Sequence, residues 1–171
     1  IEHALLTGAP LCGMNVDFAK AFDRLPFHIL LNIAGEARAD SNILRALGGM
    51  HSQLQRRFKL PGGLVGEPFS STNGILQGCP ISVILLNMYI QTWLNLIGDQ
   101  VPEAKSQSYA DDLLLTAQTI EVLDHAIKVT ELYAQDTGML LSPKKSCIWA
   151  TLPHLREELW RIQIAGQCIP A

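Results

Sequence analysis

The sequence predicts an α+β domain in which helices cover one face of an antiparallel sheet. Buried strand patterns occur at residues 11–18 and 147–151, and hairpin patterns occur between residues 57 and 72 and between residues 105 and 117. Stretches with the apolar spacing of amphipathic helices lie between them. With 171 residues, 48% of them hydrophobic, the chain is long enough to bury a core as one globular domain.

The first strand is expected to end in an acid, Asp17, for which a helix cap or a loop carboxylate is the alternative interpretation. Pro26 suits the first turn of a helix, and Ser41 is a plausible cap for a second helix. The apolar faces of these helices are expected at helical spacing: Phe27, Leu30, Leu31 and Ala34 in the first, and Ile43, Leu47, Met50 and Leu54 in the second.

A short hairpin is expected at residues 57–60 and 64–72, around a Pro-Gly-Gly turn. The basic residues Arg56, Arg57 and Lys59 stand at its start. They fit either a solvated helix end or a phosphate contact, and the sequence favours neither.

Residues 74–82 predict a loop that leads into a helix opened by Pro80. Gly78 would let the main chain approach a ligand, and Gln77 offers a side-chain amide. A simple turn before a helix is the alternative.

Two adjacent acids, Asp111 and Asp112, are expected at the tip of a hairpin with arms at 105–110 and 113–117. Like charges this close raise each other's pKa unless a cation offsets them, so a divalent cation with oxygen ligands is a natural companion. A solvated turn is the alternative. If the hairpin lies beside the first strand, Asp17 joins the pair, and three carboxylates can hold two divalent ions about 3.5–4 Å apart.

The last third of the chain predicts a helix capped by Thr119 and ending near Gly138, then a loop and a strand at 147–151. Residues 153–160 suggest a short helix, and the last ten residues suggest the start of another strand.

Composition restricts the partners and the location. The net charge of −3 is not that of a typical nucleic-acid-binding domain. The four cysteines are scattered, so reduced thiols in an intracellular protein are expected, with nucleus or cytoplasm left open. The longest apolar run, residues 81–90, is too short to span a bilayer, and no membrane partner is expected.

Four segments in order resemble the motifs of reverse transcriptases, most closely those of non-long-terminal-repeat retrotransposons and group II introns. They are residues 16–23, 74–82, 109–112 and 142–146, and the resemblance covers about residues 11–150. Ile164-Ala165-Gly166 is a poor match to the start of the primer-contacting motif, and Val83 stands where the family has proline. The resemblance implies a polymerase palm-like sheet. Residues 1–171 are expected to form a partial reverse transcriptase domain with fingers and thumb largely missing.

The resemblance also implies a metal site. Asp17 and Asp111 would be the principal ligands of two Mg²⁺ ions, or of Mn²⁺, with Asp112 as supporting acid. Phe18 would lend a backbone carbonyl. The reaction would join a deoxynucleoside triphosphate to a primer 3′-hydroxyl.

The remaining implied roles concern the substrates, which would be an RNA template, a DNA primer and the incoming nucleotide. Phe22 would sense the sugar, Gln77 and Gly78 would line the nucleotide and template pocket, Tyr109 would touch the primer end, and Lys145 would lie near the leaving pyrophosphate. A core aromatic and a solvated loop lysine are the alternatives for Phe22 and Lys145.

Two other functions compete with polymerase activity. One is a catalytically silent palm remnant that acts at most as a nucleic-acid-binding or interaction module, and we expect the isolated 171-residue chain to be inactive. The other is a metal-dependent hydrolase on another fold, which explains the acids but not residues 74–82 or the lysine-containing loop. The sequence does not indicate the oligomeric state.

Overall fold

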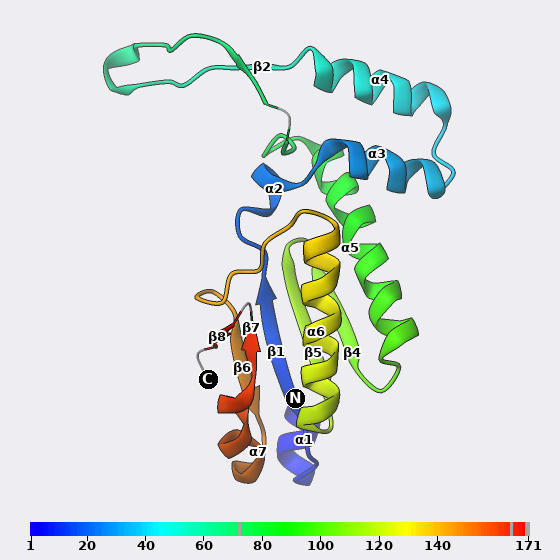
Figure 1. The fold of residues 1–171 in the computed structure, drawn as a ribbon, viewed down its shortest axis with the longest axis vertical. Helices are drawn as coiled ribbons and strands as arrows, with labels where there is room; N and C mark the ends of the chain where they lie inside the picture. Colours follow the sequence, from blue (N-terminus) through cyan, green and yellow to red (C-terminus); the bar gives the residue numbers. More distant parts are fainter. Residues whose placement is uncertain (72, 165, 170–171) are drawn as a thin grey trace.

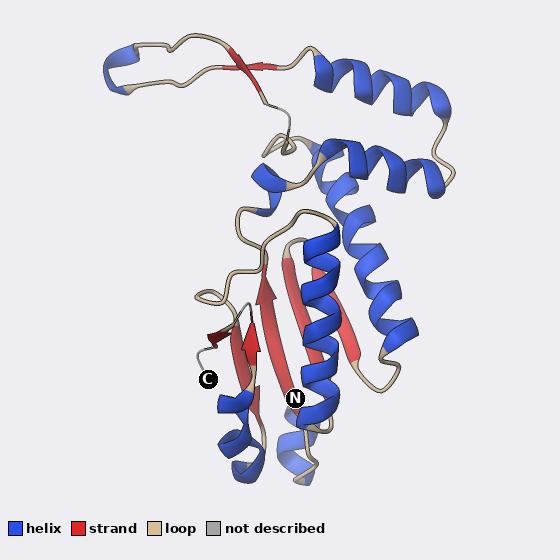
Figure 2. Cartoon of the chain, in the orientation of Figure 1, coloured by secondary structure: helices blue, strands red, loops and turns tan. Residues whose placement is uncertain are grey.

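The computed structural model describes residues 1–71, 73–164 and 166–169. The helices and strands are shown in Figures 1 and 2. In chain order they are α1 (Glu2–Thr7), β1 (Cys12–Asp17), α2 (Ala21–Arg24), α3 (Phe27–Glu36), α4 (Ser41–Ser52), β2 (Gln55–Arg56), β3 (Phe69–Ser70), α5 (Pro80–Gln100), β4 (Lys105–Tyr109), β5 (Asp112–Ala117), α6 (Ile120–Asp136), β6 (Cys147–Ala150), α7 (Pro153–Glu158), β7 (Gln163–Ile164) and β8 (Gln167–Cys168), with short 3₁₀ turns at Pro61–Gly63 and Leu159–Arg161.

A four-stranded antiparallel sheet in the order β4-β5-β1-β6 forms the centre of the molecule. Helices α5 and α6 pack against it: in Figure 1, α6 lies in front of the sheet and α5 runs beside β4 and α6. The α+β prediction is therefore confirmed. Along β1 the side chains of Cys12, Met14 and Val16 are buried beneath the helices, while Asn15 is exposed. Because successive strand residues face opposite sides, Asn15 and Asp17 belong to the open face of the sheet.

The core lies between the sheet and the two long helices. Trp93 and Tyr89 of α5 are fully buried, as is Leu115 of β5. The Trp93 indole donates a hydrogen bond to the Thr130 hydroxyl of α6 at 3.0 Å, and Tyr133 donates to the Tyr89 carbonyl at 2.7 Å. These bonds satisfy polar atoms that burial would otherwise penalise, so they fix the register of α5 against α6.

Helix α5 is longer than the apolar run seen in the sequence. Its 21 residues and its mean hydropathy of 1.4 over 18 residues would suffice, by length and composition, to cross a membrane. Core helices of globular domains meet the same criterion, and 39% of that window is buried inside the domain. The position of α5 between the sheet, α3 and α6 is that of a core helix.

Helices α3 and α4 and the β2–β3 hairpin extend beyond one end of the sheet (Figure 1). Asp40, and not Ser41, caps α4, because its carboxylate accepts a hydrogen bond from the Asn42 amide at 2.8 Å. The apolar spacing of α4 correctly indicated a helix, but its apolar face is largely uncovered: Ile43 is 58% exposed and Met50 is 50% exposed. Periodicity predicts a helix without specifying what covers it.

The predicted first hairpin is present, and it begins two residues earlier than expected. Strands β2 and β3 pair Gln55 with Ser70, and an isolated bridge joins Lys59 to Val65. The last residue of the predicted second arm, Thr72, lies outside the described residues, as does Ala165 of the poorly matching segment. The chain's final strands, β7 and β8, pair with each other as a separate two-stranded sheet.

The tip of the acidic hairpin differs from the prediction by one residue. Tyr109 pairs with Asp112, so the two-residue turn consists of Ala110 and Asp111, and not of Asp111 and Asp112. Ala110 has a φ of +53°, which is uncommon for a residue other than glycine. The sequence Tyr-Ala-Asp-Asp contains no glycine to indicate this position, and Asp is itself a common turn residue.

Candidate active site

Asp17 and Asp112 lie opposite each other on neighbouring strands. They are the last cross-strand pair between β1 and β5. Side chains of directly opposed residues project from the same face of a sheet, here the face that the helices leave open. Asp111 follows in the turn, one residue before Asp112. The expected approach of the first strand to the acidic hairpin is therefore present.

The surroundings of Asp17 disfavour its charged form. Partial burial raises the pKa of the Asp17 carboxyl, Lys145 opposes that rise, and the negative charges of Asp111 and Asp112 add to it. The three carboxylates thus lie near enough to interact electrostatically. A cation between them would reverse this penalty.

One oxygen of Asp17 is buried without a partner. Among the described residues, Asp17 Oδ2 has no hydrogen bond. The Lys145 ammonium nitrogen lies 3.9 Å from it, which is close enough for an ion pair and too far for a hydrogen bond. The Lys145 side chain is 69% exposed, so solvent screens this pair and it contributes little to stability.

These residues fit a divalent cation by their chemistry. Carboxylate oxygens are the ligands that Mg²⁺ and Mn²⁺ take, and Asp17 Oδ2 has no hydrogen bond that a cation would have to replace. Within the described part of the chain, no three His, Cys, Asp or Glu side chains are already gathered at metal-binding distances. Binding would therefore require the Asp111 and Asp112 side chains to turn toward Asp17.

The loop at residues 142–146 holds the main chain of Asp17. The Asp17 amide donates to Ser146 Oγ at 3.2 Å, and the Ser142 amide donates to the Asp17 carbonyl at 2.8 Å. Sequence reasoning singled out Lys145 in this loop and missed Ser146. A serine before a strand carries no signal of its own, and its role becomes visible only once β6 is paired with β1.

The two residues predicted near the sugar and the metal lie on the segment that follows β1. Phe18 is 2% exposed, and its ring meets the Tyr89 ring edge-on at 6.1 Å. Phe22, in α2, is partly buried against the core. The Phe22 carbonyl accepts a hydrogen bond from the Ile75 amide at 2.7 Å. This bond joins the first motif segment to the loop before α5.

Glycine is required where that loop meets α2. Gly74 has a φ of +86°, and a Cβ at this position would lie 2.6 Å from the Asp23 carbonyl oxygen. Farther along the loop, Gln77 and Gly78 are exposed, and Gly78 has a φ of +82°. Tyr109, at the end of β4, is 85% exposed. These three residues are therefore accessible to a ligand.

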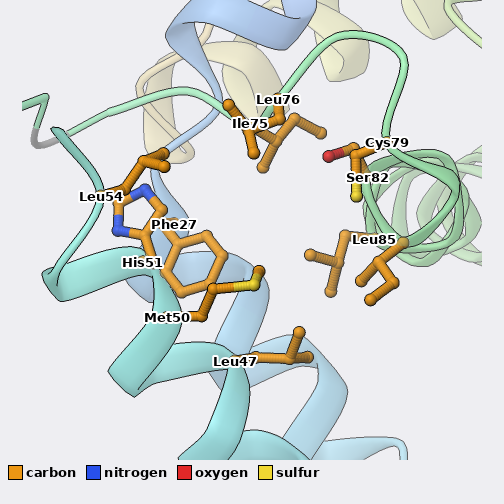
Figure 3. Close-up of a pocket in the computed structure, with 11 residues that line it drawn as sticks. Phe27, Leu47, Met50, His51, Leu54, Ile75, Leu76, Cys79, Ser82 and Leu85 are labelled. Atoms are coloured by element: carbon orange, nitrogen blue, oxygen red, sulfur yellow. The ribbon is translucent and has the colours of Figure 1, made fainter. Parts of the chain in front are cut away.

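An apolar pocket lies beside this loop, between α3, α4 and the start of α5 (Figure 3). Phe27 and Met50 line one side, and Leu76 and Leu85 line the other. The His51 ring stacks on Phe27 with centroids 3.8 Å apart, and its Nε2 lies 3.3 Å from the Gly74 carbonyl oxygen. The pocket contains none of the acids, so it is distinct from the candidate active site.

An antiparallel sheet backed by helices, with acids paired at the ends of two central strands, is the architecture of a polymerase palm. The family profile described as "Reverse transcriptase (RNA-dependent DNA polymerase)" matches residues 2–162. The chain belongs to the reverse transcriptase family, as its four motif segments predicted.

Two relatives come from mobile elements. The Xenopus laevis "Transposon TX1 uncharacterized 149 kDa protein" is 26% identical over 155 residues, and the match covers 85% of this chain and 12% of that protein. The "Retrovirus-related Pol polyprotein from type-1 retrotransposable element R2" of Popillia japonica is 24% identical over 161 residues, covering 85% of this chain and 26% of the relative. The likeness to non-long-terminal-repeat elements is confirmed. The chain spans about an eighth of the length of the first relative and about a quarter of the length of the second.

Solved structures share the fold at low sequence identity. Apo telomerase from Candida tropicalis, truncated from its C-terminal domain, superposes with a TM-score of 0.62 at 18% identity, covering 87% of this chain and 33% of that one. Telomerase from Candida albicans, in complex with a fragment of telomeric RNA, gives a TM-score of 0.61 at 14% identity, covering 86% of this chain and 29% of that one. These likenesses establish the palm-like fold.

Proposed function

We propose that this chain is the palm of an RNA-directed DNA polymerase from a mobile element, and that residues 1–171 form part of a larger catalytic domain. The observation that carries the proposal is the cross-strand pairing of Asp17 with Asp112, beside Asp111 in the turn. Family membership and the unpartnered oxygen of Asp17 support it. The substrates would be an RNA template, a DNA primer and a deoxynucleoside triphosphate.

Asp17, Asp111 and Asp112 would hold two Mg²⁺ ions, for which Mn²⁺ could substitute, with the Phe18 carbonyl as a further oxygen donor. Bound cations of this kind lower the pKa of the primer 3′-hydroxyl and neutralise charge on the triphosphate. Lys145, whose ammonium lies 3.9 Å from Asp17 Oδ2, would stabilise or protonate the leaving pyrophosphate.

Other residues would orient the substrates. Gln77 and Gly78 are exposed on the loop that is hydrogen-bonded to the Phe22 carbonyl, so they would line the nucleotide and template pocket. Phe22 would exclude a ribose 2′-hydroxyl, and Tyr109 would contact the primer end from the open face of the sheet. The four free cysteines fit the reducing interior of a cell, where such a polymerase would act.

The test is primer extension on an RNA template by the longer protein that carries this chain, compared with its Asp111→Asn variant. We expect the variant to lose extension, because the amide cannot replace an anionic metal ligand. Asp99→Asn, an exposed position in the last turn of α5, is the matched control and should extend like the wild type. Undiminished extension by Asp111→Asn would refute the assignment.

A catalytically silent palm is the second candidate, and the net charge of −3 is the observation that favours it. A silent palm predicts no extension by the longer protein with either Mg²⁺ or Mn²⁺. The isolated chain should be inactive under both proposals, so Mg²⁺-dependent extension by the 171-residue chain would exclude the silent one.

A further inference from the structure

The turn at residues 142–146 interrupts the pairing of β6 with β1 directly beside Asp17. The regular register runs from Cys12 opposite Ala150 to Asn15 opposite Cys147. Pairing resumes at a single bridge between Phe18 and Leu141. Residues 142–146 therefore lie opposite only Val16 and Asp17, as in an enlarged bulge, and Asp17 has no regular ladder partner on β6.

The Ser146 hydroxyl takes the place of that partner. Ser146 Oγ accepts the Asp17 amide at 3.2 Å and donates to the Ser142 carbonyl at 2.9 Å. The Ser142 amide in turn donates to the Asp17 carbonyl at 2.8 Å, which closes a ring of three hydrogen bonds. Ser146 is 1% exposed, so water cannot readily substitute for its hydroxyl.

This ring also determines how Asp17 meets Asp112. The amide and the carbonyl of one strand residue point to the same side, and both of these groups in Asp17 point toward the turn. Asp17 and Asp112 therefore form a non-hydrogen-bonded cross-strand pair. In such pairs the Cα atoms are closer, at about 4.5 Å, and the side chains approach each other most nearly.

We propose that Ser146 is a positioning residue for the cation site: its hydroxyl fixes the main chain of Asp17 so that the carboxylate faces the acidic hairpin. The same turn orients Lys145, whose amide bonds to the Ser142 carbonyl at 3.1 Å. This inference rests on the proposed function, because it assigns Ser146 a role toward the cations that Asp17 would hold. Removal of outer-shell partners of metal ligands typically changes metal affinity by about 10–100-fold; Ser146 acts through the main chain of Asp17, so we expect the lower end of that range.

The test uses Mn²⁺ as the probe and measures its dissociation constant, on the longer protein that carries this chain, from the electron paramagnetic resonance signal of free Mn²⁺. Ser146→Ala should weaken binding by about tenfold or more. Ser146→Cys leaves no cavity, because its side chain is slightly larger, and it offers only a weak acceptor, so it should weaken binding to a similar degree. Ser52→Ala is the control: it also removes a hydroxyl bonded to a main-chain carbonyl, at 2.9 Å, but in α4.

Amide hydrogen exchange gives a readout that does not depend on the metal. Exchange at the Asp17 amide should accelerate by about tenfold or more in both Ser146 variants and remain unchanged in Ser52→Ala. If Ser146→Ala fails to fold, Ser146→Cys, which leaves no cavity, supplies both measurements.

The outcomes separate this inference from the proposed function. If Asp17→Asn abolishes Mn²⁺ binding while both Ser146 variants bind like the wild type, the positioning role is overturned and the cation site stands. If only Ser146→Ala weakens binding, packing and not the hydrogen bond is responsible, which also overturns the role. If the wild type and Asp17→Asn bind Mn²⁺ equally weakly, the cation site and the role of Ser146 both fail.

Discussion

Gly13 lies beneath the Trp149 side chain on the open face of the sheet, and this contact leads to a stability prediction. The two residues are directly opposed on β1 and β6. A Cβ at Gly13 would overlap the Trp149 ring and would lie 2.9 Å from the Leu115 carbonyl oxygen of β5. The ring can turn aside, at the loss of its 3.3 Å hydrogen bond to Asn15, whereas the Leu115 carbonyl is held in the central strands.

The magnitude follows from two opposing effects. Forcing an extra methyl group into a packed contact costs about 1–3 kcal/mol. Replacing glycine restricts the unfolded chain and returns about 0.5–1 kcal/mol. The midpoints of these two ranges leave a net cost of about 1 kcal/mol, so we expect Gly13→Ala to lower the free energy of unfolding by about that amount, which corresponds to a fall in Tm of roughly 2–4 °C for a chain of this length.

Thermal unfolding followed by circular dichroism measures this change. Gly98→Ala in α5 is the control, because in the described structure nothing lies within 4 Å of a Cβ placed there. That variant should be more stable than the wild type by about 0.5–1 kcal/mol. A Gly13→Ala protein that melts at or above the wild-type temperature would refute the reasoning.

Three further predictions concern charge and protonation. Asp17→Asn should raise the free energy of unfolding by about 1 kcal/mol in the presence of a chelator, because it removes a charge on a buried oxygen that has no hydrogen bond. Mg²⁺ should raise Tm only in the wild type, and equal Mg²⁺ responses would contradict the site. Burial raises the pKa of Tyr133 to about 12. Its contribution to stability is therefore complete below the unfolded pKa of about 10 and is lost as pH rises toward 12. Burial also raises the pKa of Tyr89, so urea unfolding should show a loss over that range from which Tyr133→Phe removes about 2–3 kcal/mol and leaves the contribution of Tyr89. Main-chain amides of Ser82 and Ile81 lower the pKa of the Cys79 thiol, whereas burial raises the pKa of the Cys12 thiol to about 11. Labelling with iodoacetamide, followed by mass spectrometry, should therefore modify Cys79 first and Cys12 only in denaturant. Early labelling of Cys12 would contradict its burial.

The sequence was sufficient to predict the parts of the site that depend on local patterns. A buried strand pattern that ends in an acid located Asp17, two adjacent acids between apolar runs located the acidic hairpin, and the order of the elements placed them side by side. The turn was misplaced by one residue because Ala110 adopts a positive φ that no local rule assigns to alanine. The cap of α4 was misplaced because Asp40 and Ser41 are both good capping residues and only geometry distinguishes them.

Features that depend on distant segments could not be predicted. Ser146 meets Asp17 across 129 positions of sequence, and its importance arises from a gap in the β1–β6 ladder that no local pattern records. The same holds for α4, whose apolar spacing indicated a buried face, although Ile43 and Met50 remain exposed. Periodicity determines which residues share a face, but only the tertiary arrangement determines whether that face is covered.

The acids at this edge of the sheet differ in how firmly the main chain holds them. Asp17 ends an interior strand, and both of its peptide groups are bonded to the 142–146 turn. Asp111 belongs to a two-residue turn whose first member, Ala110, has an unfavourable φ. The main chain of Asp17 is thus held by a neighbouring turn, whereas Asp111 lies outside the paired strands. If these acids bind cations as proposed, the turn could adjust to ions of different radius while the sheet stays unchanged.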